Sequence, residues 1–140
     1  MAILNILKEG DETLRKVSRP VTEITPRILT LLDDMKDTMH AADGCGLAAV
    51  QVGVLRRIVI VELDGTLYEL INPRIVAFAG EQREEEGCLS LLGGPRKCRR
   101  YQTIKVQWQN EKFQTRIKTF SGWTAQIIQH EIDHCNGILI

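Results

Sequence analysis

The chain has 140 residues, of which 44% are hydrophobic and 26% are charged, an ordinary composition for a folded domain of this length. Its 18 basic residues balance its 18 acidic residues, so the formal net charge is zero. This balance argues against nucleic-acid or membrane-surface binding as the main activity, because both need a basic footprint. No apolar run approaches the ~20 residues that cross a bilayer. We therefore expect residues 1–140 to form a single domain, with neither DNA nor a membrane as partner.

The first predicted helix follows Thr25-Pro26, an N-cap residue with proline at the first helical position. Apolar residues then recur at helical spacing, and Asp43-Gly44 supplies a stop signal. The recurring residues are Ile28, Leu31, Leu32, Met35 and Met39. Because such a stripe is typical of a helix face that packs on a core, we interpret it as core and not as a cofactor site.

The central part of the chain has strand patterns. Arg57–Leu63 is rich in β-branched residues, and it meets Thr66–Ile71 across Asp64-Gly65, a two-residue hairpin signal. Asn72-Pro73 then separates this hairpin from a further strand, predicted over Arg74–Ala79. These patterns predict antiparallel pairing between neighbouring strands.

A second hairpin precedes the final helix. Thr103–Gln109 alternates apolar and polar residues, and Asn110-Glu111 can turn the chain into Lys112–Phe120. The helix that follows is predicted to begin after Ser121 or Thr124 and to end at residues 136–137, Asn-Gly. Helices that bracket strands joined by hairpins predict an α+β fold. We expect a largely antiparallel β-sheet packed around this C-terminal helix.

The final helix carries His130-Glu131-Ile132-Asp133-His134, an H-E-x-x-H motif. Histidines at i and i+4 share one face of a helix, roughly 5–6 Å apart at Cβ, so both rings can bind one metal ion. Glu131 is rotated about 100° around the helix axis, from where its carboxylate can take a proton from a metal-bound water. The alternative is a pair of surface histidines that align by chance.

The four cysteines, Cys45, Cys88, Cys98 and Cys135, show no C-x-x-C spacing. The N-terminus lacks the basic and apolar segments of a secretory signal, so reduced thiols are expected. Reduced thiols are candidate metal ligands, and a catalytic metal keeps three protein ligands and one open position. A third ligand is therefore expected outside the H-E-x-x-H motif.

Two further clusters can supply a ligand and groups that polarise an oxygen. The segment EGCLS (residues 86–90) places the Cys88 thiolate beside Gly87, which removes side-chain bulk near a metal. The segment GCGLAAVQ (residues 44–51) is a run of small residues that ends in the amide of Gln51, a donor for an oxyanion. Taken alone, each segment also fits close packing or a buried cysteine at a strand end.

In this order, GCGLAAVQ, EGCLS and HEIDHCNG resemble the three signature motifs of the peptide deformylase family. The resemblance spans nearly the whole chain. It implies an α+β metallohydrolase that removes the N-formyl group from the N-terminal formyl-methionine of newly made polypeptides and releases formate. It also implies a cytoplasmic bacterial protein or an organellar form of one, with transient ribosome contact as an option.

The resemblance assigns a role to each matching residue. The metal ligands would be Cys88, His130 and His134. Glu131 would be the general acid/base, while the Gln51 amide and the Leu89 N–H would bind the formyl oxygen. The substrate would lie against Cys45, Gly46, Gly87, Trp123, Gln126 and Ile127. Family precedent favours Fe²⁺, one per chain, with Zn²⁺, Ni²⁺ or Co²⁺ as substitutes.

The chain departs from the family pattern at several positions. Four small or apolar residues replace commoner ones, and we interpret them as tolerated packing. These residues are Cys45, Val50, Leu92 and Cys135. For Cys45 we also consider an oxidation-sensitive thiol near the substrate. Gln126 stands where an aliphatic residue is commoner, so we hypothesise a pocket that is less selective for methionine. The chain ends at Ile140 without the C-terminal segment common in the family, so we do not expect ribosome docking through such a segment.

Three alternatives remain open from the sequence. A zincin-type metalloprotease shares H-E-x-x-H but usually takes its third ligand after the motif, where none of the last six residues is His, Asp or Glu. A non-catalytic paralogue would lose Glu131 or Gln51 first, and both are present. The acidic run Glu84–Glu86 and the basic run Arg96–Arg100 flank one loop, so mutual attraction explains them, and RNA contact is the alternative.

Overall fold

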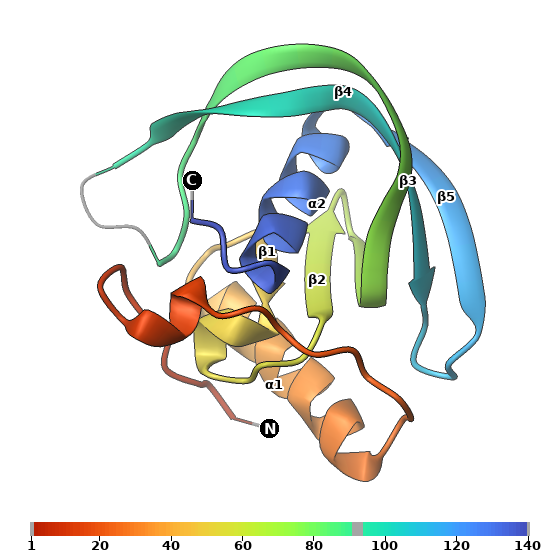
Figure 1. Ribbon diagram of the computed structural model, residues 1–140. Helices are drawn as coiled ribbons and strands as arrows, with labels where there is room; N and C mark the ends of the chain where they lie inside the picture. The colour runs from red at the N-terminus through yellow and green to blue at the C-terminus, as the bar shows by residue number, and fades with distance from the viewer. Residues whose placement is uncertain (1, 91–93, 140) are drawn as a thin grey trace.

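Helix α2 (Gly122–Cys135) lies inside the molecule, and a twisted antiparallel sheet wraps around it (Figure 1). The structure is a computed structural model that describes residues 2–90 and 94–139. Its other elements are η1 (Glu12–Arg15), α1 (Pro26–Ala41), β1 (Gly46–Ala48), η2 (Ala49–Val52), β2 (Ile58–Leu63), β3 (Thr66–Glu86), β4 (Arg96–Gln109) and β5 (Thr115–Ser121). The strands are ordered β1-β2-β3-β4-β5. The predicted α+β class, with the sheet around the C-terminal helix, is confirmed.

Figure 1 shows how the long strands cover α2. The second half of β3 and the first half of β4 form an arch over the helix, and β1 and β2 lie along its other side. Most side chains of α2 are therefore buried, including those of both motif histidines. In the described part of the chain, no helix combines the length and apolar character that a membrane crossing needs.

Strand β2 separates two apolar layers because its side chains alternate between its faces. Val59 and Val61 belong to the core around α2, whereas Ile58 and Ile60 belong to the layer formed with α1. All four side chains are fully buried, and burial of each stabilises the fold by about 1.5–3 kcal/mol. The predicted stripe of α1 lies in the second layer, so its interpretation as core is confirmed.

Helix α1 begins as predicted. The Thr25 hydroxyl accepts a hydrogen bond from the Ile28 N–H at 3.2 Å, and Pro26 is the first helical residue. The helix ends at Ala41, shortly before Asp43, which adopts a positive φ of 54°. The predicted cap and stop signals therefore both act within a few residues of their expected places.

The break predicted at Asn72-Pro73 is wrong, because β3 runs unbroken from Thr66 to Glu86. Its pairing with β4 shifts register between Ile71 and Arg74, where an irregularity accommodates the proline without a ladder N–H. Asn72 has a φ of 53°, and its side-chain amide both donates to and accepts from the Val21 backbone at 2.7 Å. These hydrogen bonds to a distant segment hold Asn72 within the strand, although Asn-Pro is a local turn signal.

Other boundaries also differ from the prediction. Strand β5 begins at Thr115, not at Lys112, because the side-chain Oδ1 atom of Asn110 accepts the N–H groups of Lys112 and Gln114 and closes a turn there. Helix α2 follows Ser121, and Thr124 lies inside it, so the Thr124 cap is wrong. The short elements β1, η1 and η2 were not predicted, since three or four residues carry too little periodicity.

The two charge runs lie on the paired ends of β3 and β4, where Glu86 is the register partner of Arg96. Three arginines of the basic run contact carboxylates. Arg96 pairs with Glu9 at 2.6 Å, Arg99 with Glu81 at 2.8 Å and Arg100 with Glu86 at 2.8 Å. Of these three contacts, only the one between Arg100 and Glu86 joins the two runs, so mutual attraction accounts for this pair, and RNA contact by the rest of the basic run stays a prediction.

Candidate metal centre

Cys88, His130 and His134 bring one donor atom each to a common point, with all three atoms within 4.8 Å of one another. Helix α2 holds the two rings one turn apart, with their Nε2 atoms 3.0 Å from each other. The segment after β3 places Cys88 Sγ 3.3 Å from His134 Nε2. The predicted ligand set is thus assembled from two segments that lie more than 40 residues apart in the sequence. One thiolate and two imidazoles form a metal-binding site that leaves room for a fourth ligand.

The protonation states show that this site fits a cation. Burial would lower the pKa of His130, but hydrogen bonds with Cys88 and Glu86 raise it to about 10. Burial and the neighbouring His130 lower the pKa of His134 to about 3. Without another cation, His130 therefore stays protonated at the point where the donors converge. A divalent metal ion at that point would replace the proton and satisfy all three donor atoms.

Glu86 orients the first histidine. Its Oε1 atom lies 2.9 Å from His130 Nδ1, so the Nε2 atom of that ring faces the other two ligands. Arg100 donates to Glu86 at 2.8 Å and to Asp133 at 2.9 Å. Burial would raise the pKa of Glu86, but its hydrogen bonds from His130 and Arg100 lower it to about 2. Glu86 therefore stays ionised and holds the ring in one tautomer.

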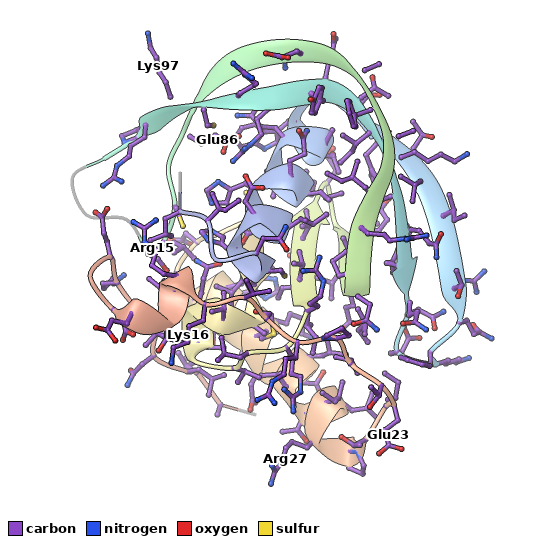
Figure 2. All side chains as sticks on the ribbon, in the orientation of Figure 1. Arg15, Lys16, Glu23, Arg27, Glu86 and Lys97 are labelled. Atoms are coloured by element: carbon purple, nitrogen blue, oxygen red, sulfur yellow. The ribbon has the colours of Figure 1, made fainter. Side chains whose placement is uncertain are left out.

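Sequence reasoning did not identify Glu86 as a site residue. The available signal was a carboxylate two positions before a candidate thiolate ligand, which alone does not indicate a contact with His130. Figure 2 shows Glu86 beneath the arch of β3 and β4, on the side of α2, and Lys97 projecting away from the molecule. The contact of Glu86 with His130 therefore results from the folding of the arch.

Glu131 lies beside the ligands and is only 4% exposed. Its Oε1 atom is enclosed and has no hydrogen-bond partner among the described residues, and it is 3.8 Å from His134 Nε2. Burial raises the pKa of Glu131 to about 7. A carboxylate in this state can both accept and release a proton near neutral pH, which is the property of a general acid/base.

Gln51 is fully buried, and its neighbours determine the orientation of its amide. The oxygen accepts the Ala48 N–H at 2.9 Å, so the NH₂ group faces the other way. This group donates to the Ser90 hydroxyl at 3.1 Å and lies 3.6 Å from Cys88 Sγ. The amide donor predicted from the sequence is thus close to the predicted thiolate ligand.

Leu89 follows Cys88 at the edge of the same site, and the N-terminal segment braces it. The Lys8 ammonium group donates to the Leu89 carbonyl at 2.8 Å, and the Glu9 N–H donates to the Ser90 carbonyl at 2.7 Å. The Ser90 N–H in turn points at Cys88 Sγ at 3.4 Å. These contacts hold the backbone around the predicted Leu89 donor in one conformation.

A pocket of about 300 Å³ opens beside the ligands. All the residues predicted to contact substrate line it, namely Cys45, Gly46, Gly87, Trp123, Gln126 and Ile127. Cys88, Leu89, His130 and Glu131 line it as well, whereas Gln51 and His134 lie behind its wall. The structure therefore brings the predicted site residues together around one cavity.

The two predicted glycines have different reasons to be glycine. A Cβ atom on Gly46 would approach Glu131 Oε2 to 2.8 Å and Ile127 Cγ2 to 2.9 Å, so a side chain there would displace Glu131. A Cβ atom on Gly87 would meet no described atom within 4 Å. The structure thus does not bear out the idea that Gly87 clears bulk around the metal ligands, since its free side faces the pocket.

The departures from the family pattern also have structural positions. Val50 and Cys135 are fully buried in the core, and burial raises the pKa of Cys135 to about 12, so tolerated packing is confirmed for both. Cys45 lines the pocket, but burial and the charge of Glu131 raise its pKa. This disfavours the reactive thiolate that an oxidation-sensitive Cys45 needs. Leu92 lies outside the described residues.

Comparison with known proteins gives a consistent result. A family model for polypeptide deformylase matches residues 3–140. The peptide deformylase of Thermoanaerobacter pseudethanolicus is 48% identical over 139 residues, which cover 99% of this chain and 87% of that protein. Peptide deformylase structures from Legionella pneumophila and Thermotoga maritima both superpose with a TM-score of 0.95, at 40% and 34% identity. They cover 99% of this chain, and 83% and 95% of their own chains are matched.

These matches extend over the whole arrangement described above. They include both segments that supply ligands and the sheet that encloses α2. The resemblance of the three sequence motifs is therefore confirmed by matches along the full chain, and the zincin-type alternative is wrong. This chain belongs to the polypeptide deformylase family.

Proposed function

We propose that this chain is a peptide deformylase, a hydrolase that removes the N-formyl group from the formyl-methionine of newly made polypeptides and releases formate. The observation that carries this proposal is the convergence of the Cys88, His130 and His134 donor atoms beside the buried Glu131, at the wall of a pocket. The relatives named above are peptide deformylases. A non-catalytic paralogue would have no need for Glu131 in this state.

The residues of the chain divide the reaction among them. A divalent ion held by Cys88, His130 and His134 would supply Lewis acidity and lower the pKa of water from 15.7 toward about 7. Glu131 would take the proton from the attacking water and deliver it to the leaving amine as the formyl C–N bond breaks. The pKa of Glu131, about 7, suits both halves of this transfer.

The formyl oxygen would gain negative charge during the attack, and donors are needed on that side. We assign this role to the NH₂ group of Gln51, which lies 3.6 Å from Cys88 Sγ, and to the backbone N–H of Leu89, the residue that follows Cys88 at the pocket wall. The substrate backbone would pair with β1, an edge strand of the sheet with Gly46 at its start. The first side chain would then lie between Trp123, Gln126 and Ile127.

For the metal we propose Fe²⁺, one ion per chain, with Zn²⁺, Ni²⁺ and Co²⁺ as substitutes. One thiolate and two imidazoles can bind each of these ions, and family precedent supports iron. Anaerobic reconstitution with each ion, followed by elemental analysis and assay, tests the choice. Higher kcat/KM of the zinc protein than of the iron protein would contradict it.

The central experiment measures formate release from formyl-Met-Ala-Ser by protein prepared anaerobically with Fe²⁺. We expect rapid release by the wild type and a loss of at least ~10²-fold in Glu131→Ala, since general acid–base catalysis contributes 10²–10⁴-fold. Both proteins should bind one metal ion per chain. Equal rates in the two proteins would refute the proposed role of Glu131, and no release by the metal-loaded wild type would refute the proposed function.

We also propose that the reaction takes place in the bacterial cytoplasm, where formylated chains leave the ribosome. The relatives named above come from bacteria. Any ribosome contact would be transient, because the arginines of the basic run are engaged with Glu9, Glu81 and Glu86. Sedimentation of the protein with ribosomes at physiological salt would contradict this expectation.

A further inference from the structure

Three glutamines of the described chain are buried, and one of them differs from the other two. The amide of Gln51 is held by Ala48 and Ser90, as described above. The amide of Gln129 accepts the Tyr101 N–H at 2.7 Å and donates to the Tyr101 carbonyl at 2.7 Å. Gln126 is only 7% exposed, yet its amide forms no hydrogen bond with any described residue.

Gln126 forms part of the wall of the pocket. Gln126 lines the cavity, and its amide atoms are not among the fully enclosed side-chain atoms without a partner. It lies one helical turn before His130, so it shares the helix face that carries the metal ligands. The neighbouring parts of the wall, Trp123 and Ile127, offer apolar surface. Among the described residues, the pocket wall therefore contains, besides Glu131, a second polar group without a hydrogen-bond partner, about 5–6 Å along α2 from the first histidine.

The Gln126 amide weakens the binding of an apolar side chain in the pocket and can strengthen the binding of a polar one. An apolar side chain that fills the pocket would remove water from the amide and leave it unpaired, which weakens binding by roughly 10-fold or more. The methionine thioether is only a weak acceptor and cannot repay this loss in full. A linear side chain with a strong acceptor at the same position would accept a hydrogen bond from the Gln126 NH₂ group.

Newly made chains in this reaction begin with methionine, and oxidation converts that side chain to the sulfoxide, a polar group of similar length. We propose that Gln126 adapts the pocket to N-formyl peptides whose first residue is methionine sulfoxide, with the Gln126 NH₂ group as donor to the sulfoxide oxygen. This inference rests on the proposed function. The reaction is the same hydrolysis, in which water adds to the formyl carbon and the amine leaves with a proton, and the sulfoxide is unchanged.

The test compares kcat/KM for three peptides, formyl-Met-Ala-Ser, its sulfoxide and formyl-norleucyl-Ala-Ser, with iron-loaded wild type and Gln126→Leu. We expect the wild type to use the sulfoxide at least as well as the thioether. In Gln126→Leu, the sulfoxide-to-thioether ratio should fall ~10-fold and kcat/KM for norleucine should rise ~10-fold, which corresponds to about 1.4 kcal/mol each. Opposite changes for two substrates cannot come from general damage to the protein.

Gln102→Leu is the matched control, because it makes the same replacement at an exposed position of β4. Its substrate ratios should equal those of the wild type. If Gln126→Leu does not fold, Gln126→Met provides a second apolar replacement of similar shape. Equal sulfoxide-to-thioether ratios in the wild type and the folded apolar variant would overturn the inference.

Binding supplies a readout that does not depend on turnover. Titration calorimetry of the uncleaved formyl peptides is carried out with two metal-loaded proteins, Glu131→Ala and the double variant Glu131→Ala/Gln126→Leu. In the double variant, the affinity for the sulfoxide peptide should fall ~10-fold relative to the affinity for the thioether peptide. Equal weakening of both peptides would overturn the inference. If the wild type released formate from none of the peptides, the proposed function itself would fail, whereas unchanged ratios in an active enzyme refute only the role of Gln126.

Discussion

The orientation of the Gln51 amide is decided by a single backbone contact. Because its oxygen accepts the Ala48 N–H at 2.9 Å, only the NH₂ group is directed to Cys88 and Ser90. A donor that is already oriented needs no rearrangement when charge develops on a substrate oxygen, which is the condition for strong transition-state stabilisation. The burial of this residue would thus serve the proposed oxyanion role as well as the packing around η2.

Replacement of Gln51 tests this role. We expect Gln51→Leu to lower kcat by roughly 10²–10³-fold, the loss seen when one oxyanion donor is removed, with a smaller effect on KM. Formate release and metal content are measured together, because Gln51 also approaches the Cys88 thiolate. A metal-loaded variant with nearly normal kcat would contradict the assignment.

Gly46 offers a second test at the scale of one residue. A methyl group there would collide with Glu131 and Ile127, and a displacement of about 1 Å at a catalytic group can cost 10²-fold in rate. We therefore expect Gly46→Ala to lower kcat by ~10²-fold while metal content stays at one ion per chain. Gly87→Ala serves as the matched change, since its methyl group meets no described atom, and it should retain much more activity than Gly46→Ala.

At the scale of elements, one network ties the arch of β3 and β4 to α2. Arg100 of β4 contacts Glu86 of β3 and Asp133 of α2, and Glu86 contacts His130. All these groups except Asp133 are less than one-tenth exposed. Loss of one partner would leave a buried charge uncompensated, so the network couples the position of a metal ligand to the docking of the sheet.

The pH dependence of stability follows from Glu86. Its pKa falls from an ordinary 4.5 to about 2 on folding, so its contribution is complete above pH 4.5 and is lost as the pH falls through about 2. As the pH falls from about 4.5 to about 2, we expect the free energy of unfolding of the chelator-treated wild type to decrease by about 3 kcal/mol through this group. Urea unfolding at pH 5 and pH 2.5 should show a smaller loss for Glu86→Gln. Glu81→Gln, at an exposed ion pair, should behave like the wild type, and equal losses in all three proteins would contradict the assignment.

At the scale of the whole molecule, the metal site joins two segments that lie more than 40 residues apart in the sequence. Cys88 follows β3, whereas the histidines lie on α2 inside the sheet. A ligand that binds only the folded state stabilises it by mass action, by about 2.7 kcal/mol at a concentration 100 times its Kd. Metal binding should therefore stabilise the contact between the segment after β3 and the helix.

Metal removal tests this coupling. We expect a chelator to lower the Tm of the reconstituted protein by roughly 5–10 °C, as followed by circular dichroism, and added metal to restore it. Cys88→Ala lacks one ligand and should show a much smaller change. An identical Tm with and without chelator, in protein shown to have lost its metal, would contradict the coupling.

The sequence by itself determined the features that depend on neighbouring residues. Helical spacing predicted that His130 and His134 share one face, and cap signals located α1 to within a few residues. Three short motifs identified the family and the residues of the metal site, and they predict Glu131 as the acid/base. Each of these properties is set within one element or one motif, so no knowledge of the folded chain was needed.

Only the tertiary structure decided which distant groups meet. The contact between Glu86 and His130 spans 44 residues, and the continuity of β3 across Asn72 depends on Val21. Burial of Glu131 by several elements raises its pKa, and the same packing leaves the Gln126 amide unpaired at the pocket. These outcomes depend on how the sheet closes around α2, because burial and long-range hydrogen bonds are properties of the packed molecule and not of any single segment.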